Sequence, residues 1–131
     1  MKARKITSQT ALDSEIRELY ETAFPVEEQI PYEDLMVLMD RMPLDFTAYY
    51  ENGEFMGFTI VYPRKKFNWF WYFAVRDDLR GRGIGQRILS MLIEEYKHCT
   101  NILDMESPDQ VCENAEVRKR RCAFYLRNGF R

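Results

Sequence analysis

Val75-Arg76-Asp77-Asp78-Leu79-Arg80-Gly81-Arg82-Gly83-Ile84-Gly85-Gln86 is the stretch of the sequence that decides the fold. An aromatic and β-branched run precedes it, and apolar residues at helical spacing follow it. The stretch therefore predicts a buried strand, a tight turn and a helix. Unpaired backbone N–H groups and the positive end of the helix dipole meet at such a helix start, which forms an anion site without any side chain. Glycine at every second position lets the main chain approach a phosphate closely.

Two other phosphate-binding motifs do not fit this turn. The dinucleotide-binding fingerprint requires glycine where Gln86 stands. The P-loop requires Gly-Lys followed by Ser or Thr, and the turn continues instead as Gly85-Gln86-Arg87. A tight turn that uses glycine only for packing is the alternative. The sequence has no motif for a nucleotide base, so a nucleotide-binding protein is not favoured.

The residues before the turn predict a hairpin, a further strand and two helices. Residues 46–50 and 54–62 are aromatic and β-branched, and Asn52-Gly53 between them predicts a β-hairpin. The strand at 68–75 is apolar on both faces, so we expect it in the centre of the sheet. Nearer the N-terminus we expect a short strand at 5–7, a helix that Pro25 ends and a second helix from Pro31. These helices carry apolar residues expected to point inward, namely Leu12, Ile16, Leu19, Tyr20, Ala23, Leu35, Met36 and Met39.

After the turn the pattern is helix, strand, helix. A helix from Ile84 with one apolar face leads to a short buried strand at 102–105. A last helix at 116–128 is closed by Gly129. Strand, helix and strand form a right-handed βαβ unit with two parallel strands. The fold class is therefore α/β, with residues 1–131 as a single domain.

Composition excludes several classes of protein. The net charge of −2 does not favour a nucleic-acid partner. The longest apolar run, at 67–75, is too short to span a membrane, and no signal peptide pattern is present, so we expect a cytoplasmic protein. Three cysteines without CxxC spacing predict neither a disulfide framework nor a metal site. The only histidine, His98, has no nucleophile partner in the sequence.

Three motifs together resemble the GNAT superfamily of acetyltransferases. Arg80 to Gly85 follows the pattern Arg/Gln-x-x-Gly-x-Gly/Ala, and Phe73-Ala74-Val75 is similar to the strand that precedes it in that family. Phe124-Tyr125-Leu126-Arg127-Asn128-Gly129-Phe130 resembles the family's Phe-Tyr-x-x-x-Gly-Phe helix end. The resemblance implies the acyl-CoA N-acyltransferase fold, a mixed central sheet with helices on both faces. It also implies acetyl-CoA as acetyl donor and a small-molecule or peptide amine as acceptor, without a metal.

The resemblance also implies roles for particular residues. Backbone N–H groups from Arg82 to Gln86 would hold the pyrophosphate of CoA, and the main chain of 73–75 would pair with the pantetheine arm. One N–H group of that strand would polarise the thioester carbonyl. The expected cofactor-binding residues are Phe73, Ala74, Val75, Arg80, Gly81, Arg82, Gly83, Ile84, Gly85 and Gln86.

Tyr125 and Glu106 are the expected catalytic residues. The resemblance implies that Tyr125 protonates the departing CoA thiolate, and a core tyrosine is the alternative. An ammonium ion cannot attack a thioester, so a carboxylate must remove a proton from the acceptor. Glu106, at the end of the predicted strand 102–105, is the candidate for this base, and a solvated acid is the alternative. Acidic residues before or within the second helix mildly favour a cationic amine, namely Glu27, Glu28, Glu33 and Asp34.

The sequence departs from the family in two places. Arg118 stands where the family frequently has asparagine, and the basic run from Arg118 to Arg121 is either a solvated face or a contact for the adenosine 3′-phosphate. Family members also continue with two more strands after Gly-Phe, whereas this sequence ends at Arg131. We therefore expect a domain without its last strands and a possible homodimer. A catalytic N-acetyltransferase and a non-catalytic acyl-CoA-binding module both remain open.

Overall fold

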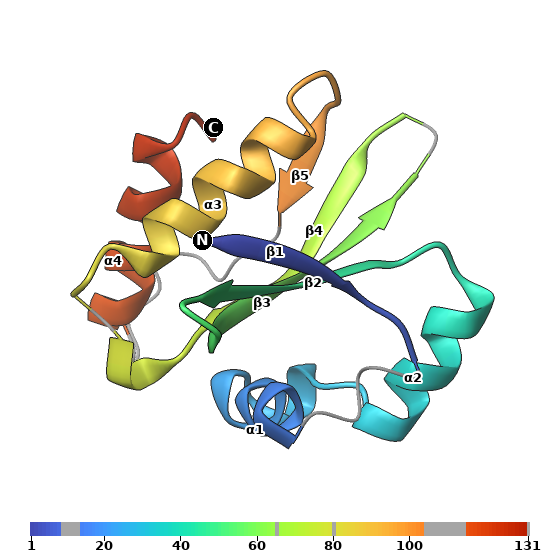
Figure 1. Ribbon diagram of the computed structural model, residues 1–131. Coiled ribbons are helices and arrows are strands. Elements are labelled where there is room, and N and C mark those ends of the chain that lie inside the picture. Colours follow the sequence, from blue (N-terminus) through green and yellow to red (C-terminus); the bar gives the residue numbers. More distant parts are fainter. Residues whose placement is uncertain (9–13, 65, 80, 104–114, 131) are drawn as a thin grey trace.

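The computed structural model describes residues 1–8, 14–64, 66–79, 81–103 and 115–130, without the side chains of 115, 117 and 118. Within these residues, five strands form one mixed sheet in the order β1-β2-β3-β4-β5 (Figure 1). Neighbouring strands from β1 to β4 are antiparallel, and β4 and β5 are parallel. The strands are β1 (Lys2–Ile6), β2 (Asp45–Glu51), β3 (Glu54–Pro63), β4 (Asn68–Val75) and β5 (Asn101–Leu103).

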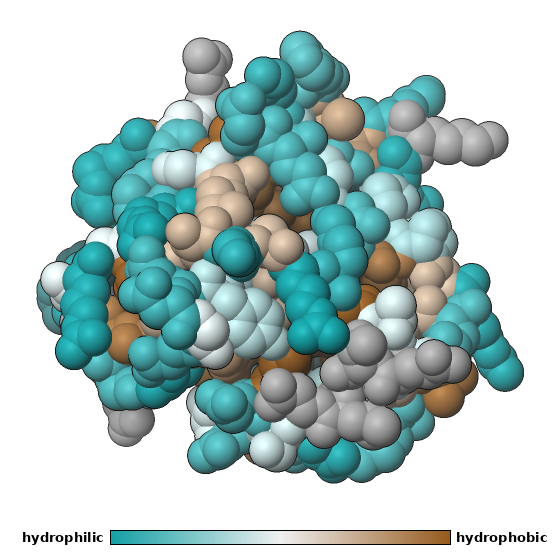
Figure 2. Space-filling view, viewed as in Figure 1, coloured by the Kyte–Doolittle hydropathy of each residue, from teal (hydrophilic) through white to brown (hydrophobic). Residues whose placement is uncertain are grey.

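Helices cover both faces of this sheet, as the sequence predicts (Figure 1). On one face, α1 (Ser14–Ala23) and α2 (Tyr32–Arg41) bury Ile16, Tyr20 and Leu35 against the strands. On the other face, α3 (Ile84–Glu95) and α4 (Ala115–Arg127) pack through two further apolar clusters. Short 3-10 turns, η1 (Val26–Glu28) and η2 (Asp77–Leu79), follow α1 and β4. Hydrophilic side chains dominate the outer surface in the view of Figure 2.

The predicted hairpin and the predicted βαβ unit are both confirmed. Asn52 and Gly53 have positive φ angles of 53° and 80°, the conformation that a tight two-residue hairpin turn requires. The helix α3 connects β4 to the parallel strand β5. None of the helices within the described ranges is long and apolar enough to cross a membrane.

A glycine in β3 allows the sheet and α3 to approach closely. A Cβ atom built on Gly57 would lie 2.3 Å from the carbonyl oxygen of Ala74 and 3.2 Å from Cδ1 of Ile88. Both distances are shorter than ordinary van der Waals contact, so any side chain at this position would displace β4 or α3. Gly57 therefore sets the spacing of the layer that carries the glycine-rich turn.

One prediction about the strands is confirmed and one is wrong. β4 is an inner strand of the sheet, paired with β3 on one side and with β5 on the other, and β5 spans Asn101–Leu103. Ile102 was expected to be buried, but 41% of its surface is exposed. β5 pairs with β4 at only three positions, from Asn68 to Phe70, and an apolar run by itself does not distinguish an interior strand from an edge strand.

Candidate active site

β4 and Leu103 of β5 form one wall of a cleft of about 1130 Å³. The cleft runs from the α1–η1 connection, across β4, to the glycine-rich turn and the C-terminal half of α4. It therefore brings together the three motifs on which the family resemblance rests. Phe73, Ala74, Val75 and Tyr125 all line it, and so do Gly81, Gly83, Ile84, Gly85 and Gln86.

The main chain of β4 presents alternate residues to the cleft. The N–H group of Arg76 donates to the carbonyl of Met56, so these two residues form a hydrogen-bonded pair of the antiparallel β3–β4 ladder. Such pairs alternate along a ladder, which directs the polar groups of Ala74 toward β3 and those of Phe73 and Val75 away from it. The described part of β5 pairs only as far as Phe70. Phe73 and Val75 are therefore the residues whose main chain faces the cleft.

The glycine-rich turn leads directly into α3. Gly83 is the N-cap residue in a left-handed conformation, with φ of 71°, and no side chain caps the helix. The first helical hydrogen bond runs from the Arg87 N–H group to the Gly83 carbonyl at 3.1 Å. The N–H groups of Ile84, Gly85 and Gln86 precede that bond and have no partner within the helix. Together with the dipole of this 12-residue helix they give the turn the geometry of the anion site that the sequence predicts.

Among the described residues, the positive charge that lines the cleft belongs to α4. Arg80 lies outside the described residues, and Arg82 is exposed and does not line the cleft. Arg121 and Arg127 of α4 do line it. The alternative that the basic run of α4 contacts a phosphate is therefore supported by the position of Arg121. Arg76 points elsewhere, since it forms ion pairs with Glu54 and Asp78.

Tyr125 is held by the end of α4. The Phe130 N–H group donates to the Tyr125 carbonyl at 3.2 Å and the Gly129 N–H group to Leu126 at 3.1 Å, with Gly129 at φ of 93°. These two bonds form a Schellman motif, in which the side chains of Tyr125 and Phe130 meet at 5.7 Å between ring centres. The Phe-Tyr-x-x-x-Gly-Phe pattern thus has a local physical cause.

The same packing changes the acidity of Tyr125. Burial raises the pKa of its phenol, and the positive charge of Arg121 opposes this shift. Within the described ranges the hydroxyl has no hydrogen-bond partner. A phenol with a raised pKa keeps its proton at neutral pH and is suited to donate it.

A side-chain link joins the glycine-rich turn to α4. The amides of Gln86 and Asn128 bond reciprocally, at 2.6 Å from Gln86 Nε2 and 3.1 Å from Asn128 Nδ2. The Asn128 amide also donates to the Phe124 carbonyl at 2.8 Å. Sequence reasoning assigned only the backbone of Gln86 to the site and missed this pair. No local pattern could reveal it, because the two residues lie far apart in the chain.

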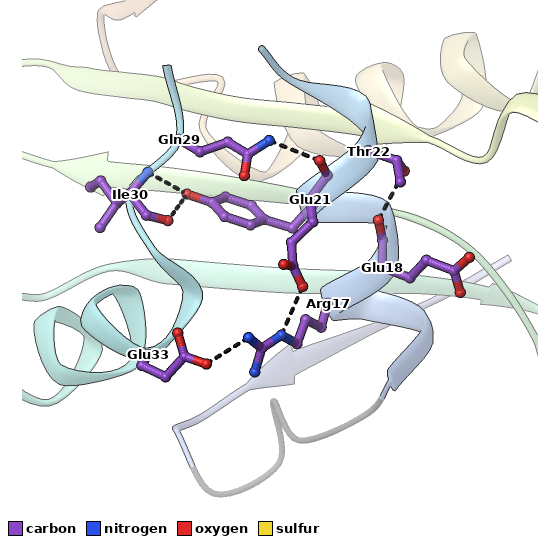
Figure 3. Close-up of polar contacts among 8 residues, drawn as sticks. Arg17, Glu18, Glu21, Thr22, Gln29, Ile30 and Glu33 are labelled. Carbon is purple, nitrogen blue, oxygen red and sulfur yellow. Dashed lines mark hydrogen bonds and ion pairs between the residues drawn. The ribbon is translucent and has the colours of Figure 1, made fainter. Parts of the chain in front are cut away.

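The other end of the cleft is formed by the segment after α1. Gln29 donates from its amide to the carbonyls of Glu21 and Phe24, at 2.8 and 2.7 Å. The hydroxyl of Tyr20 bonds both the N–H group and the carbonyl of Ile30. Figure 3 shows Gln29 and Ile30 held against α1 by these bonds. They fix the segment from the end of α1 to η1, which brings Phe24 and Glu28 to the cleft.

The acidic residues expected near the acceptor do not gather there. Glu28 lines the cleft, whereas Glu27, Glu33 and Asp34 do not. Glu33 forms an ion pair with Arg17 at 2.5 Å, visible in Figure 3, on the side of α1. Glu106 lies outside the described residues.

The described part of the site contains neither a cysteine nor a group that could bind a metal ion. Cys99 is exposed, Cys122 is half-buried and neither lines the cleft, while Cys112 lies outside the described residues. Among the residues that the structure describes, no group of three His, Cys, Asp or Glu side chains could hold a metal ion.

Fold and cleft together define the class of protein as an acyltransferase. A family model for the acetyltransferase (GNAT) domain matches residues 44–131, so the chain belongs to the GNAT acetyltransferase family. No curated protein sequence matches the chain.

Solved structures give the same class. A GNAT-family protein from Bacteroides thetaiotaomicron is 27% identical, with a TM-score of 0.82 over 98% of this chain and 71% of its own. An aminoglycoside acetyltransferase from an uncultured soil sample is 19% identical, with a TM-score of 0.70 over 99% of this chain and 91% of its own. The PaiA N-acetyltransferase from Thermoplasma acidophilum, in complex with coenzyme A, is 16% identical, with a TM-score of 0.67 over 99% of this chain and 89% of its own. The last two likenesses concern the fold alone.

Proposed function

We propose that the protein transfers an acetyl group from acetyl-CoA to a primary amine by direct attack in a ternary complex. The observation that carries this proposal is the convergence of three features on one cleft. These are the helix start at Gly83, the open main chain of β4 and the buried phenol of Tyr125. A turn that only bound an anion would require neither the open main chain of β4 nor the buried phenol of Tyr125.

The cofactor would lie along the α3 and α4 side of the cleft. Its pyrophosphate would accept hydrogen bonds from the N–H groups of Ile84, Gly85 and Gln86. Arg121 and Arg127 line the same region and would add positive charge. A Cβ atom built on Gly85 would lie 3.6 Å from Cγ2 of Val75, so the helix start is adjacent to β4. The pantetheine arm can therefore continue from the turn onto the open main chain of Phe73 and Val75.

The reaction needs a proton donor and a proton acceptor. The amine nitrogen attacks the thioester carbonyl carbon, and an N–H group of Phe73 or Val75 stabilises the oxyanion. The C–S bond then breaks, and Tyr125 gives its proton to the CoA thiolate. The surplus proton of the amine goes to a carboxylate, for which we retain Glu106. Glu28 and Asp77 are the described acids that line the cleft, and Glu28, at the acceptor end, is the second candidate.

The experiment that tests the proposal is an acceptor-panel assay that follows free thiol from acetyl-CoA. We expect thiol release that depends on both acetyl-CoA and an amine, with an acetylated amine as product. Stabilisation by acetyl-CoA without amine-dependent thiol release would instead indicate a non-catalytic acyl-CoA-binding module. Glu106→Gln and Glu28→Gln are compared in the same assay across pH. The variant of the true base loses most activity at low pH, where the amine is most protonated.

A further inference from the structure

An irregularity in β4 places three aromatic side chains on one side of the sheet. Tyr72 pairs with Ile60 and Phe70 pairs with Val61, so Trp71 has no residue opposite it. One extra residue of this kind is a β-bulge, and it breaks the alternation of side chains between the two faces. Trp71 consequently packs with the cluster on the α1 face, to which Tyr72 also belongs.

The result is a continuous stack of rings, which we call the aromatic ladder (Phe24, Trp69, Trp71 and Tyr72). Trp69 and Trp71 stack at 5.3 Å with 22° between their planes, and Trp71 and Tyr72 at 5.1 Å with 29°. Phe24, from the end of α1, meets Tyr72 edge-on at 4.9 Å. All four residues line the cleft, and both tryptophans are only half-buried.

Two hydroxyl groups beside the ladder already form hydrogen bonds within the protein. The Tyr72 hydroxyl donates to the Glu28 carbonyl at 2.9 Å, and the Thr22 hydroxyl donates to the Glu18 carbonyl at 2.8 Å. Among the described residues that line this end of the cleft, the ring faces of the ladder therefore form most of the surface that a ligand would meet. A polyhydroxylated ligand would lose water from its hydroxyl groups here without gaining partners.

We propose that the acceptor is an arylalkylamine, whose ring packs against the aromatic ladder while its amino group points to the thioester. The inference rests on the proposed function and names its substrate class. Aromatic faces match a planar apolar body by area and ring stacking. The aromatic ladder disfavours amino sugars and polyamines, because these ligands need many polar contacts along their length.

The binding test uses the protein's own fluorescence. Its only two tryptophans, Trp69 and Trp71, are both in the ladder, so emission excited at 295 nm reports on this wall alone. The CoA-bound protein is titrated with 2-phenylethylamine, glucosamine and spermidine, which do not absorb at that wavelength. We expect a saturable change in emission with 2-phenylethylamine at a concentration at least about tenfold below that of the other two. No change in emission at a concentration that saturates turnover would overturn the proposal.

The kinetic test compares variants. Trp69→Ala and Trp71→Ala should raise KM for 2-phenylethylamine about tenfold or more and leave KM for acetyl-CoA near that of the parent, whereas Trp71→Phe should retain most of the affinity. Phe67→Ala removes a half-buried ring that packs on Arg64 outside the cleft, and it should change neither KM. Circular dichroism and stabilisation by acetyl-CoA establish that each variant folds. If a variant does not fold, the fluorescence titration of the parent protein tests the proposal without it.

The two proposals fail in different ways. Thiol release with glucosamine or spermidine at a kcat/KM equal to or above that of 2-phenylethylamine would refute the acceptor class and leave the acetyltransferase intact. Absence of acetyl-CoA binding would refute the proposed function itself.

Discussion

The two ends of the cleft differ in which atoms face the ligand. At the cofactor end, the N–H groups of α3 and the main chain of Phe73 and Val75 provide most of the contacts that we propose. At the acceptor end, the rings of the aromatic ladder cover the wall, and nearby polar groups bond inside the protein. Main-chain recognition depends on local conformation, which glycine spacing reveals. Side-chain recognition depends on which faces the strands present, and a single bulge can change that.

The largest effect should come from a single substitution that blocks the cofactor end of the cleft. Gly83→Glu places a side chain and a negative charge where a phosphate would bind, so acetyl-CoA should no longer stabilise the protein. For the parent, a ligand at ~100 times its Kd adds about 2.7 kcal/mol to the free energy of unfolding. Thermal unfolding with and without acetyl-CoA measures the loss.

The matched control for that variant is Gly53→Glu. Gly53 also has a positive φ angle, 80°, and open space around its Cα atom, but it lies in the β2–β3 hairpin. Both variants place a glutamate at a positive φ angle and add the same charge. An equal loss of stabilisation in both would mean that Gly83 acts through folding and that the pyrophosphate site lies elsewhere.

The next effect should appear in turnover. Tyr125→Phe removes the proton donor and should lower kcat by roughly 10²- to 10⁴-fold with little change in the affinity for acetyl-CoA. Tyr62→Phe removes a hydroxyl from a tyrosine outside the cleft and should leave kcat unchanged. Steady-state kinetics with both substrates distinguish the two, and a parental kcat in Tyr125→Phe would assign Tyr125 to packing.

The raised pKa of Tyr125 also predicts a pH dependence. The folded protein holds this proton more tightly than the unfolded chain, so its contribution to stability is complete below the usual tyrosine pKa of about 10 and is lost as pH rises above it. The parent should therefore lose more stability than Tyr125→Phe between about pH 10 and pH 11. Chemical denaturation at both pH values measures the difference, and equal losses would contradict the assignment of the shift to Tyr125.

The smallest effect concerns the hydrogen-bonded link between the start of α3 and the end of α4. In a double-mutant cycle on Gln86 and Asn128, the two side chains should be coupled by about 0.5–1.5 kcal/mol in the free energy of unfolding. Chemical denaturation of the two single Ala variants and the double variant measures it. Additive effects would show that the pair does not hold the helix start to α4.

Much of the fold was predictable because its signals are local. Asn52-Gly53 sets a hairpin by its φ angles, Gly83 sets a helix start in the same way, and Gly129 completes a Schellman motif at a helix end. Apolar spacing identified Ile16, Tyr20 and Leu35 as core residues because helix periodicity places them on one face. Each of these signals requires only neighbouring residues.

The sequence by itself thus determined the fold class, the glycine-rich helix start and the family to which the chain belongs. Only the tertiary structure decided that Ile102 lies exposed at the sheet edge, that Arg121 faces the cleft and that Trp71 shares a side with Tyr72. These outcomes depend on strand register and on the packing of α4, which join residues distant in the chain. No local propensity encodes such pairings, because their free energy arises only when the layers meet.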